Sequence, residues 1–240
     1  MVDAPSLPTA VSDAAVQGAH SLFEELVGNT GILDPDGLTK MFTYIGEHAD
    51  FQPAILRELF GPMKLALAQG GWFIMPPEKT SLVLHSDEHV LYEVPAEVLK
   101  EVIDRQMRGS YQGLSIPIGL GVSYQTGGGV SHIETIGSHW TPADEGTLTL
   151  TDSRLVYHGL RQTLEFPLQN LASLTAYADA ISIGATNRDG NSYFRIWKPQ
   201  LAVGLIQGAV SHVGNINAIL FEFEGHEGPE EHGFKVRLEP

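Results

Sequence analysis

The string His-Ser-Asp-Glu-His at residues 85–89 has residue types and a spacing that suit metal chemistry. His85, Glu88 and His89 match the H-x-x-E-H pattern, in which two imidazoles and a carboxylate serve zinc-dependent hydrolysis. That chemistry needs a helix, where positions four apart share a face and both histidines reach one ion. Here the flanking residues alternate as in strands, and Ser-Asp is typical of turns. We therefore predict a polar hairpin tip, and keep a metal-dependent hydrolase as the alternative.

Other catalytic residue types do not gather into a pattern that predicts chemistry. The chain has no cysteine, which excludes thiol nucleophiles and thiolate metal sites. Ser115 lacks the G-x-S-x-G surroundings of a serine nucleophile, and the glycines at residues 127–129 lack the lysine of a phosphate-binding loop. We predict a protein that is not an enzyme and that uses no cofactor.

The charge of the chain limits its partners. Its 240 residues include 29 acidic and 14 basic side chains, for a net charge of -15. Nucleic acids and anionic membranes attract clustered Lys and Arg, so we expect neither as a partner. The absence of cysteine, and of a basic and apolar leader in residues 1–15, suits a cytoplasmic protein.

An uncharged stretch, residues 201–221, is long enough to be compared with a membrane span. Polar side chains interrupt it, and its apolar residues recur at helical spacing on one face. We therefore expect a packing helix and no transmembrane segment. Gly204 and Gly208 are spaced to permit close contact between this helix and a sheet.

The residues before the possible metal motif predict helices. Residues 1–75 read as an N-terminal helical region, in which Asp34-Pro35 supplies an N-cap and a first-turn proline. Gly-Gly and Pro-Pro pairs then frame a WFIM linker. We expect Trp72 and Phe73 in this linker to dock against a flanking domain.

The pattern changes to β in the second part of the chain. Residues 78–216 predict a β domain of short strands that ends in the capping helix at 201–213, with one further short helix at 95–107. The run at residues 146–159, GTLTLTDSRLVYHG, predicts a tight hairpin because Leu and Thr alternate before an Asp-Ser turn. Residues 217–240 predict an acidic extension built on a final strand pair.

The hairpin run and the strands that follow it resemble the bacterial pleckstrin-homology-like (PH-like, GRAM-like) domains. Their pattern G-x-L-x-[IL]-T-x-x-R-[LI]-x-[FY]-x-G is followed by I-x-[LY]-x-x-I and D-G-I-x-I, and the resemblance covers roughly residues 115–213. Ala180 stands where the family often has Gly. The positions that match within the hairpin are Thr151, Arg154, Leu155, Tyr157 and Gly159.

This resemblance implies an α+β fold with a PH-like β-barrel capped by a C-terminal helix, here preceded by the helical region. It also implies a binding or assembly module in a bacterial cytosol, whose partner is another protein or a second copy of the chain. Phosphoinositide-binding members carry basic residues around the first hairpin loop. The corresponding SYQTGGGVSH has no Lys or Arg, so we do not expect a lipid headgroup there.

Five side chains are candidates for binding. Trp72, Phe73 and Trp140 would line an apolar pocket for a small ligand, with filling of the protein core as the simpler alternative. Arg154 and Arg161, together with Arg195 and Lys198, come nearest to a basic set in this chain. For Arg154 we also consider that it braces the turn or pairs with a carboxylate.

Overall fold

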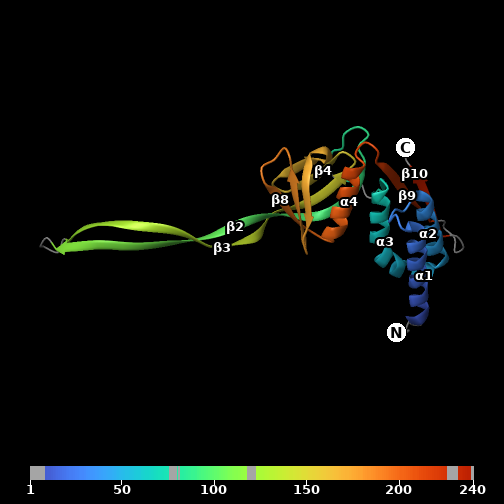
Figure 1. Cartoon of the computed structure of the whole chain (residues 1–240), viewed down its shortest axis with the longest axis horizontal. Helices are drawn as coiled ribbons and strands as arrows, with labels where there is room; N and C mark the ends of the chain where they lie inside the picture. Colours follow the sequence, from blue (N-terminus) through green and yellow to red (C-terminus); the bar gives the residue numbers. More distant parts are fainter. Residues whose placement is uncertain (1–8, 76–79, 81, 118–122, 226–231, 239–240) are drawn as a thin grey trace. The chain divides into compact units, whose positions relative to one another are not determined.

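The computed structural model describes residues 9–75, 80, 82–117, 123–225 and 232–238. Contacts divide the chain into two units, one made of residues 1–98 and 144–240 and the other of residues 99–143. The first unit holds the helices and most of the strands, so the fold is α+β. The second unit consists of the remaining lengths of two long strands, which run side by side as a two-stranded ribbon (Figure 1).

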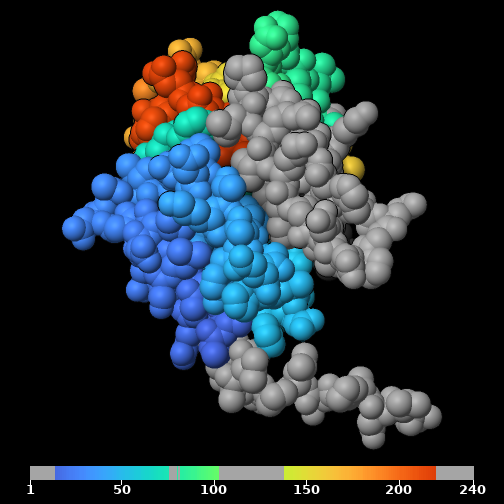
Figure 2. All heavy atoms as spheres, turned by 90° about the vertical axis from the view of Figure 1, so that its right-hand side faces the viewer, coloured from blue at the N-terminus to red at the C-terminus, as the bar shows by residue number. Residues whose placement is uncertain are grey.

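Three helices and a short 3-10 turn form the N-terminal part. They are α1 (Thr9–Val27), α2 (Pro35–Glu47), η1 (Ala49–Phe51) and α3 (Gln52–Gln69). The start of α2 follows the prediction, because the Asp34 carboxylate accepts the Gly37 N–H at 2.7 Å and Pro35 occupies the first turn. The side chains of these helices form one compact body in Figure 2. Leu38, Met41 and Ile45 of α2 lie fully buried within it.

A three-stranded sheet completes this helical part. Strand β1 (Trp72–Ile74) pairs in parallel with β9 (Asn217–Gly225), and β10 (His232–Leu238) pairs antiparallel with β9. The final strand pair was predicted correctly, but Trp72–Ile74 of the WFIM segment form a strand and not a linker. The hydrogen bonds of β1 come from β9, far away along the chain, and a local pattern cannot show them.

The larger sheet has seven strands in the order β5-β4-β3-β2-β8-β7-β6, so β5 and β6 are its two edges. The predicted hairpin is present, with Gly146 opposite Gly159 and Leu150 opposite Leu155. A 3-10 turn, η2 (Leu168–Asn170), joins the two edge strands. The strands are β2 (Val90–Pro117), β3 (Ser123–Thr151), β4 (Arg154–Gly159), β5 (Thr163–Pro167), β6 (Leu171–Ala176), β7 (Ala180–Ala185) and β8 (Asn191–Ile196).

Two local predictions before the hairpin were wrong. Residues 95–107 lie within strand β2 and are not helical. The side chains of Val94, Ala96 and Val98 are buried at a spacing of two, which is the period of a strand. The segment predicted as a strand before His85 has no strand among its described residues, and the chain turns at Asp87, whose φ is 62°.

The last helix, α4 (Pro199–Ser211), packs against β6, β7 and η2 on one side and against α3 on the other. Leu205, Ile206 and Ala209 are buried in the core that α4 shares with the seven-stranded sheet. Gly204 and Gly208 face α3 and not a sheet, which corrects the prediction. A Cβ on Gly208 would lie 2.8 Å from Ala68 Cβ, so the glycine lets the two helices approach closely. In the described part of the chain, no helix is long and apolar enough to cross a membrane.

Candidate functional site: a groove between β6 and α4

The structure places the possible metal ligands in a loop and commits their carboxylate elsewhere. Glu88 Oε1 accepts a hydrogen bond from Arg154 Nε at 2.8 Å, and Glu88 Oε2 accepts one from Arg154 Nη2 at 2.9 Å. The Nδ1 atom of His89 lies 3.3 Å from an Asp152 carboxylate oxygen. The helix that the H-x-x-E-H motif needs is absent from residues 82–89. Across the described residues, no three His, Cys, Asp or Glu side chains are grouped to hold a metal ion.

Burial and hydrogen bonding act in opposite directions on Glu88. Burial alone raises the pKa of this carboxyl group. The hydrogen bonds from Arg154, the His85 N–H, Thr151 and Ser153 outweigh burial and lower the pKa from 4.5 to about 2. Glu88 therefore stays ionised beside Arg154 at neutral pH.

Arg154, a candidate binding residue, directs its guanidinium into the protein. Besides Glu88, it donates to Glu165 at 3.0 Å and to the Val83 carbonyl at 3.1 Å. Only 8% of Arg154 and 8% of Glu88 is exposed to solvent. The Glu88–Arg154 ion pair therefore connects the loop before β2 to strands β4 and β5. This is the bracing role considered for Arg154.

Trp72 and Phe73, two of the aromatic candidates, do not line the same core. Trp72 packs against the helical core, whereas Phe73 is buried in the core of the seven-stranded sheet. Neighbouring residues of a strand point to opposite faces, and this separates the two rings. Trp140 belongs to the second unit and is 43% exposed.

Arg161 lies in the loop between β4 and β5, where its backbone N–H donates to Asp144 at 3.1 Å. The same carboxylate accepts the N–H groups of Gln162 and Glu145. The backbone of Arg161 thus belongs to a loop that Asp144 organises.

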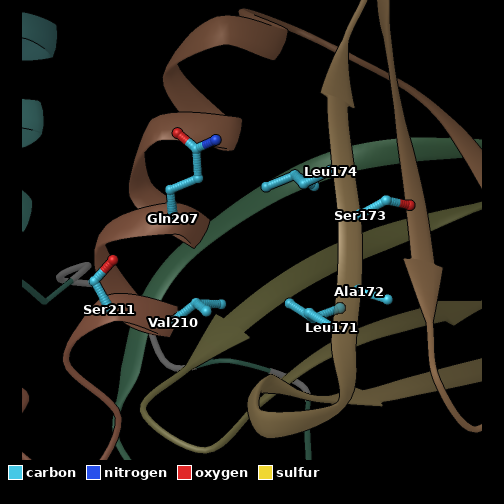
Figure 3. A pocket seen from close by; sticks show the side chains of 7 residues that line it. All are labelled: Leu171, Ala172, Ser173, Leu174, Gln207, Val210 and Ser211. Carbon is cyan, nitrogen blue, oxygen red and sulfur yellow. The ribbon is translucent and has the colours of Figure 1, made fainter.

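A different site lies along the edge strand β6. A groove of about 450 Å³ runs between β6 and the C-terminal half of α4. In Figure 3 the side chains of Leu171 and Leu174 point toward α4, and Val210 points back toward β6. The lining residues are Leu171, Ala172, Ser173, Leu174, Gln207, Val210 and Ser211.

A β-bulge shapes the floor of this groove. The pairing of β6 with β7 shifts register between Leu171 and Ser173, so Ala172 is the extra residue. A bulge changes which side chains share a face, and here Leu171 and Leu174 come to the same side although they are three positions apart. Two leucines of one strand therefore meet Val210 of the helix.

The outer edge of β6 carries backbone groups that β7 does not use. The Tyr177 N–H donates to the Ala180 carbonyl at 2.7 Å, so this facing pair is a hydrogen-bonded one. Hydrogen-bonded and non-hydrogen-bonded pairs alternate along an antiparallel ladder. Since Leu174 faces Ile183 and Ala176 faces Ile181 in that register, the N–H and C=O groups of Leu174 and Ala176 point away from β7.

The two edges of the sheet differ in charge. Strand β6 and helix α4 contain no Asp, Glu, Lys or Arg, in a chain whose net charge is -15. The other edge strand, β5, carries Glu165, and Arg188 donates to the Glu165 carbonyl at 3.0 Å while lying over the Phe166 ring. Charged side chains protect edge strands from pairing with other chains. Strand β5 is protected in this way and β6 is not.

Among known proteins, no family model matches this chain, and no curated protein sequence matches it. The groove was not predicted from the sequence, because an edge is a property of strand order. The available signal was the lack of charge in residues 166–178 and again in residues 199–221.

Proposed function

We propose that this chain is a non-catalytic, PH-like interaction module that binds another protein at the β6–α4 groove. The observation that carries the proposal is the uncharged outer edge of β6 beside an apolar groove. A sheet of seven strands followed by a helix packed on it supports the PH-like part.

An exposed strand edge is a template for a further strand, because its unpaired N–H and C=O groups bind an extended peptide. Main-chain hydrogen bonds then provide affinity, and side-chain pockets provide selectivity. At β6 the backbone groups of Leu174 and Ala176 serve the first role. The hollow between Leu171, Leu174 and Val210 serves the second.

Two valines of similar exposure give a matched test. Val210 lines the groove and is 38% exposed, whereas Val213 is 41% exposed and does not line it. Val210→Glu places a carboxylate in the apolar hollow, and Val213→Glu adds the same charge outside it. We expect affinity capture to retain the same partner with wild type and Val213→Glu and to lose it with Val210→Glu. Equal retention by the two variants, with unchanged melting temperatures, would contradict a docking role for the groove.

A further inference from the structure

We propose that the occupant of the groove is an uncharged, extended segment of about six residues, contributed by a partner protein and added to β6 as an antiparallel strand. This inference rests on the proposed function and names the chemistry and the pose of the partner.

The length of the bound segment follows from the lengths of β6 and α4, which line the groove. Strand β6 has 6 residues, which at about 3.3 Å per residue span about 20 Å. Helix α4 has 13 residues, which at about 1.5 Å per residue span a similar length. The elements run in opposite directions, since Leu171 shares the groove with Ser211 at one end and Gln200 Nε2 donates to the Tyr177 carbonyl at the other. Strand β6 ends at Ala176, so the open edge ends there.

The pose follows from the geometry of antiparallel pairing. Leu174 and Ala176 point their N–H and C=O groups outward, so each exchanges hydrogen bonds with the residue directly opposite on an added strand. Directly opposite residues of two strands project to the same face of a sheet. Leu174 points toward α4, so the added residues that pair with Leu174 and Ala176 also point toward α4. An antiparallel strand is favoured because parallel pairing is slightly less stable per residue.

The chemistry follows from the lining. A charged side chain in the hollow would lose water and meet no opposite charge, because neither wall carries one. Apolar side chains suit Leu171, Leu174 and Val210, while Gln207 and Ser211 supply neutral polar groups on the helix. The segment therefore alternates, with small apolar residues toward α4 and polar residues toward solvent.

Capped hexapeptides of alternating valine and threonine test this pose by fluorescence anisotropy. In the proposed pose the valines face α4 and their N–H groups pair with β6, whereas the threonine N–H groups point away. N-methylation of the valines should weaken binding about tenfold or more, because about two hydrogen bonds are lost. N-methylation of the threonines should leave binding nearly unchanged. Replacing the valines by glutamate should abolish binding.

A proline variant tests the same edge from the side of the protein. Ala176→Pro removes an N–H that the β6–β7 ladder does not use, so the protein should stay folded but bind the valine-threonine peptide about tenfold more weakly. Ala176→Ser keeps the N–H and should bind as wild type does. Thermal melting of both variants checks that the fold is retained.

The outcomes separate this inference from the proposed function. The antiparallel pose would be overturned if N-methylation of the valines left peptide binding unchanged. It would also be overturned if only N-methylation of the threonines prevented binding. Absence of peptide binding at millimolar concentrations would overturn the inference, while the Val210→Glu capture experiment would still decide the function. Concentration-dependent dimerisation that is lost in Ala176→Pro, without peptide binding, would assign the edge to a second copy and overturn the partner segment.

Discussion

Glu88 and Arg154 are 66 residues apart in the sequence and form a buried, two-pronged ion pair. The guanidinium also reaches Glu165 and the Val83 carbonyl, so one side chain connects the loop before β2 with β4 and β5. Charges removed from water depend on each other, because loss of one leaves the other uncompensated. The sheet therefore tolerates this arginine only while its carboxylate is present.

Removal of the buried carboxylate should be strongly destabilising. We expect Glu88→Ala to lower the free energy of unfolding by about 3–5 kcal/mol, because it leaves a buried guanidinium without its opposite charge. Glu165→Ala removes the second carboxylate, whose side chain is about half exposed, and should cost only about 0–1 kcal/mol. Urea unfolding at pH 7 measures both. Equal losses of unfolding free energy in the two variants would show that the contribution of the ion pair does not depend on burial.

The Glu88–Arg154 pair also predicts how the stability of the folded protein changes at acid pH. The pKa of Glu88 is lowered from 4.5 to about 2 in the folded protein, so the folded state binds fewer protons than the unfolded state between these values. The stability that Glu88 contributes is therefore fully present above about pH 4.5 and is lost as the pH falls toward 2. Urea unfolding from pH 6 to pH 3 should show the gap between wild type and Glu88→Ala narrowing. A constant gap would contradict the lowered pKa.

The parts of the fold that the sequence predicted have local signals. Asp34-Pro35 at the start of α2 and the Asp-Ser turn of the β3–β4 hairpin depend on neighbouring residues alone. Residues 95–107 misled because Val98 and Val102 fit a helical spacing, while the partner strand β8 lies about a hundred residues away. Strand pairing outweighed a local pattern there.

The site was harder to predict than the fold. Trp72 and Phe73 were chosen for their size, yet alternation along β1 sends them into two different cores. Arg154 was chosen for its charge, which an internal carboxylate neutralises. The residues that line the groove, such as Leu174 and Gln207, carry no distinctive chemistry. Their interest comes from the position of β6 at the end of the sheet.

The hydrogen bonds of Asp144 allow a second test of stability. It is 5% exposed and accepts the backbone N–H groups of Glu145, Arg161 and Gln162, so it fixes the loop between β4 and β5. Asp144→Ala removes a buried carboxylate that accepts three backbone N–H groups, and should cost about 1–3 kcal/mol. The neighbouring Glu145 is exposed, and Glu145→Ala should change little. Chemical denaturation checks this order, and the reverse order would refute the role of Asp144.

The contact between α3 and α4 predicts that alanine substitutions at two glycines lower the stability by different amounts. A Cβ on Gly208 would lie 2.7 Å from the Ala68 carbonyl oxygen, and backbone cannot move away cheaply. A Cβ on Gly204 would meet only the end of the Leu65 side chain, which can change rotamer. Gly208→Ala should therefore lose about 1–3 kcal/mol and Gly204→Ala clearly less. Differential scanning calorimetry gives the ranking, and a larger loss at Gly204 would contradict this account of the packing.

The docking of α4 on the sheet is tested by two residues of the same helix. Leu205 is 2% exposed and contributes to the core of the seven-stranded sheet, whereas Gln207 is exposed at the groove. Truncating a buried leucine to alanine costs about 2–5 kcal/mol, because transfer energy is lost and a cavity remains. For a chain of this size that lowers the melting temperature by about 4 °C or more. Gln207→Ala removes an exposed side chain and should shift it by about 1 °C or less. Small and equal shifts would mean that Leu205 does not anchor α4 to the sheet.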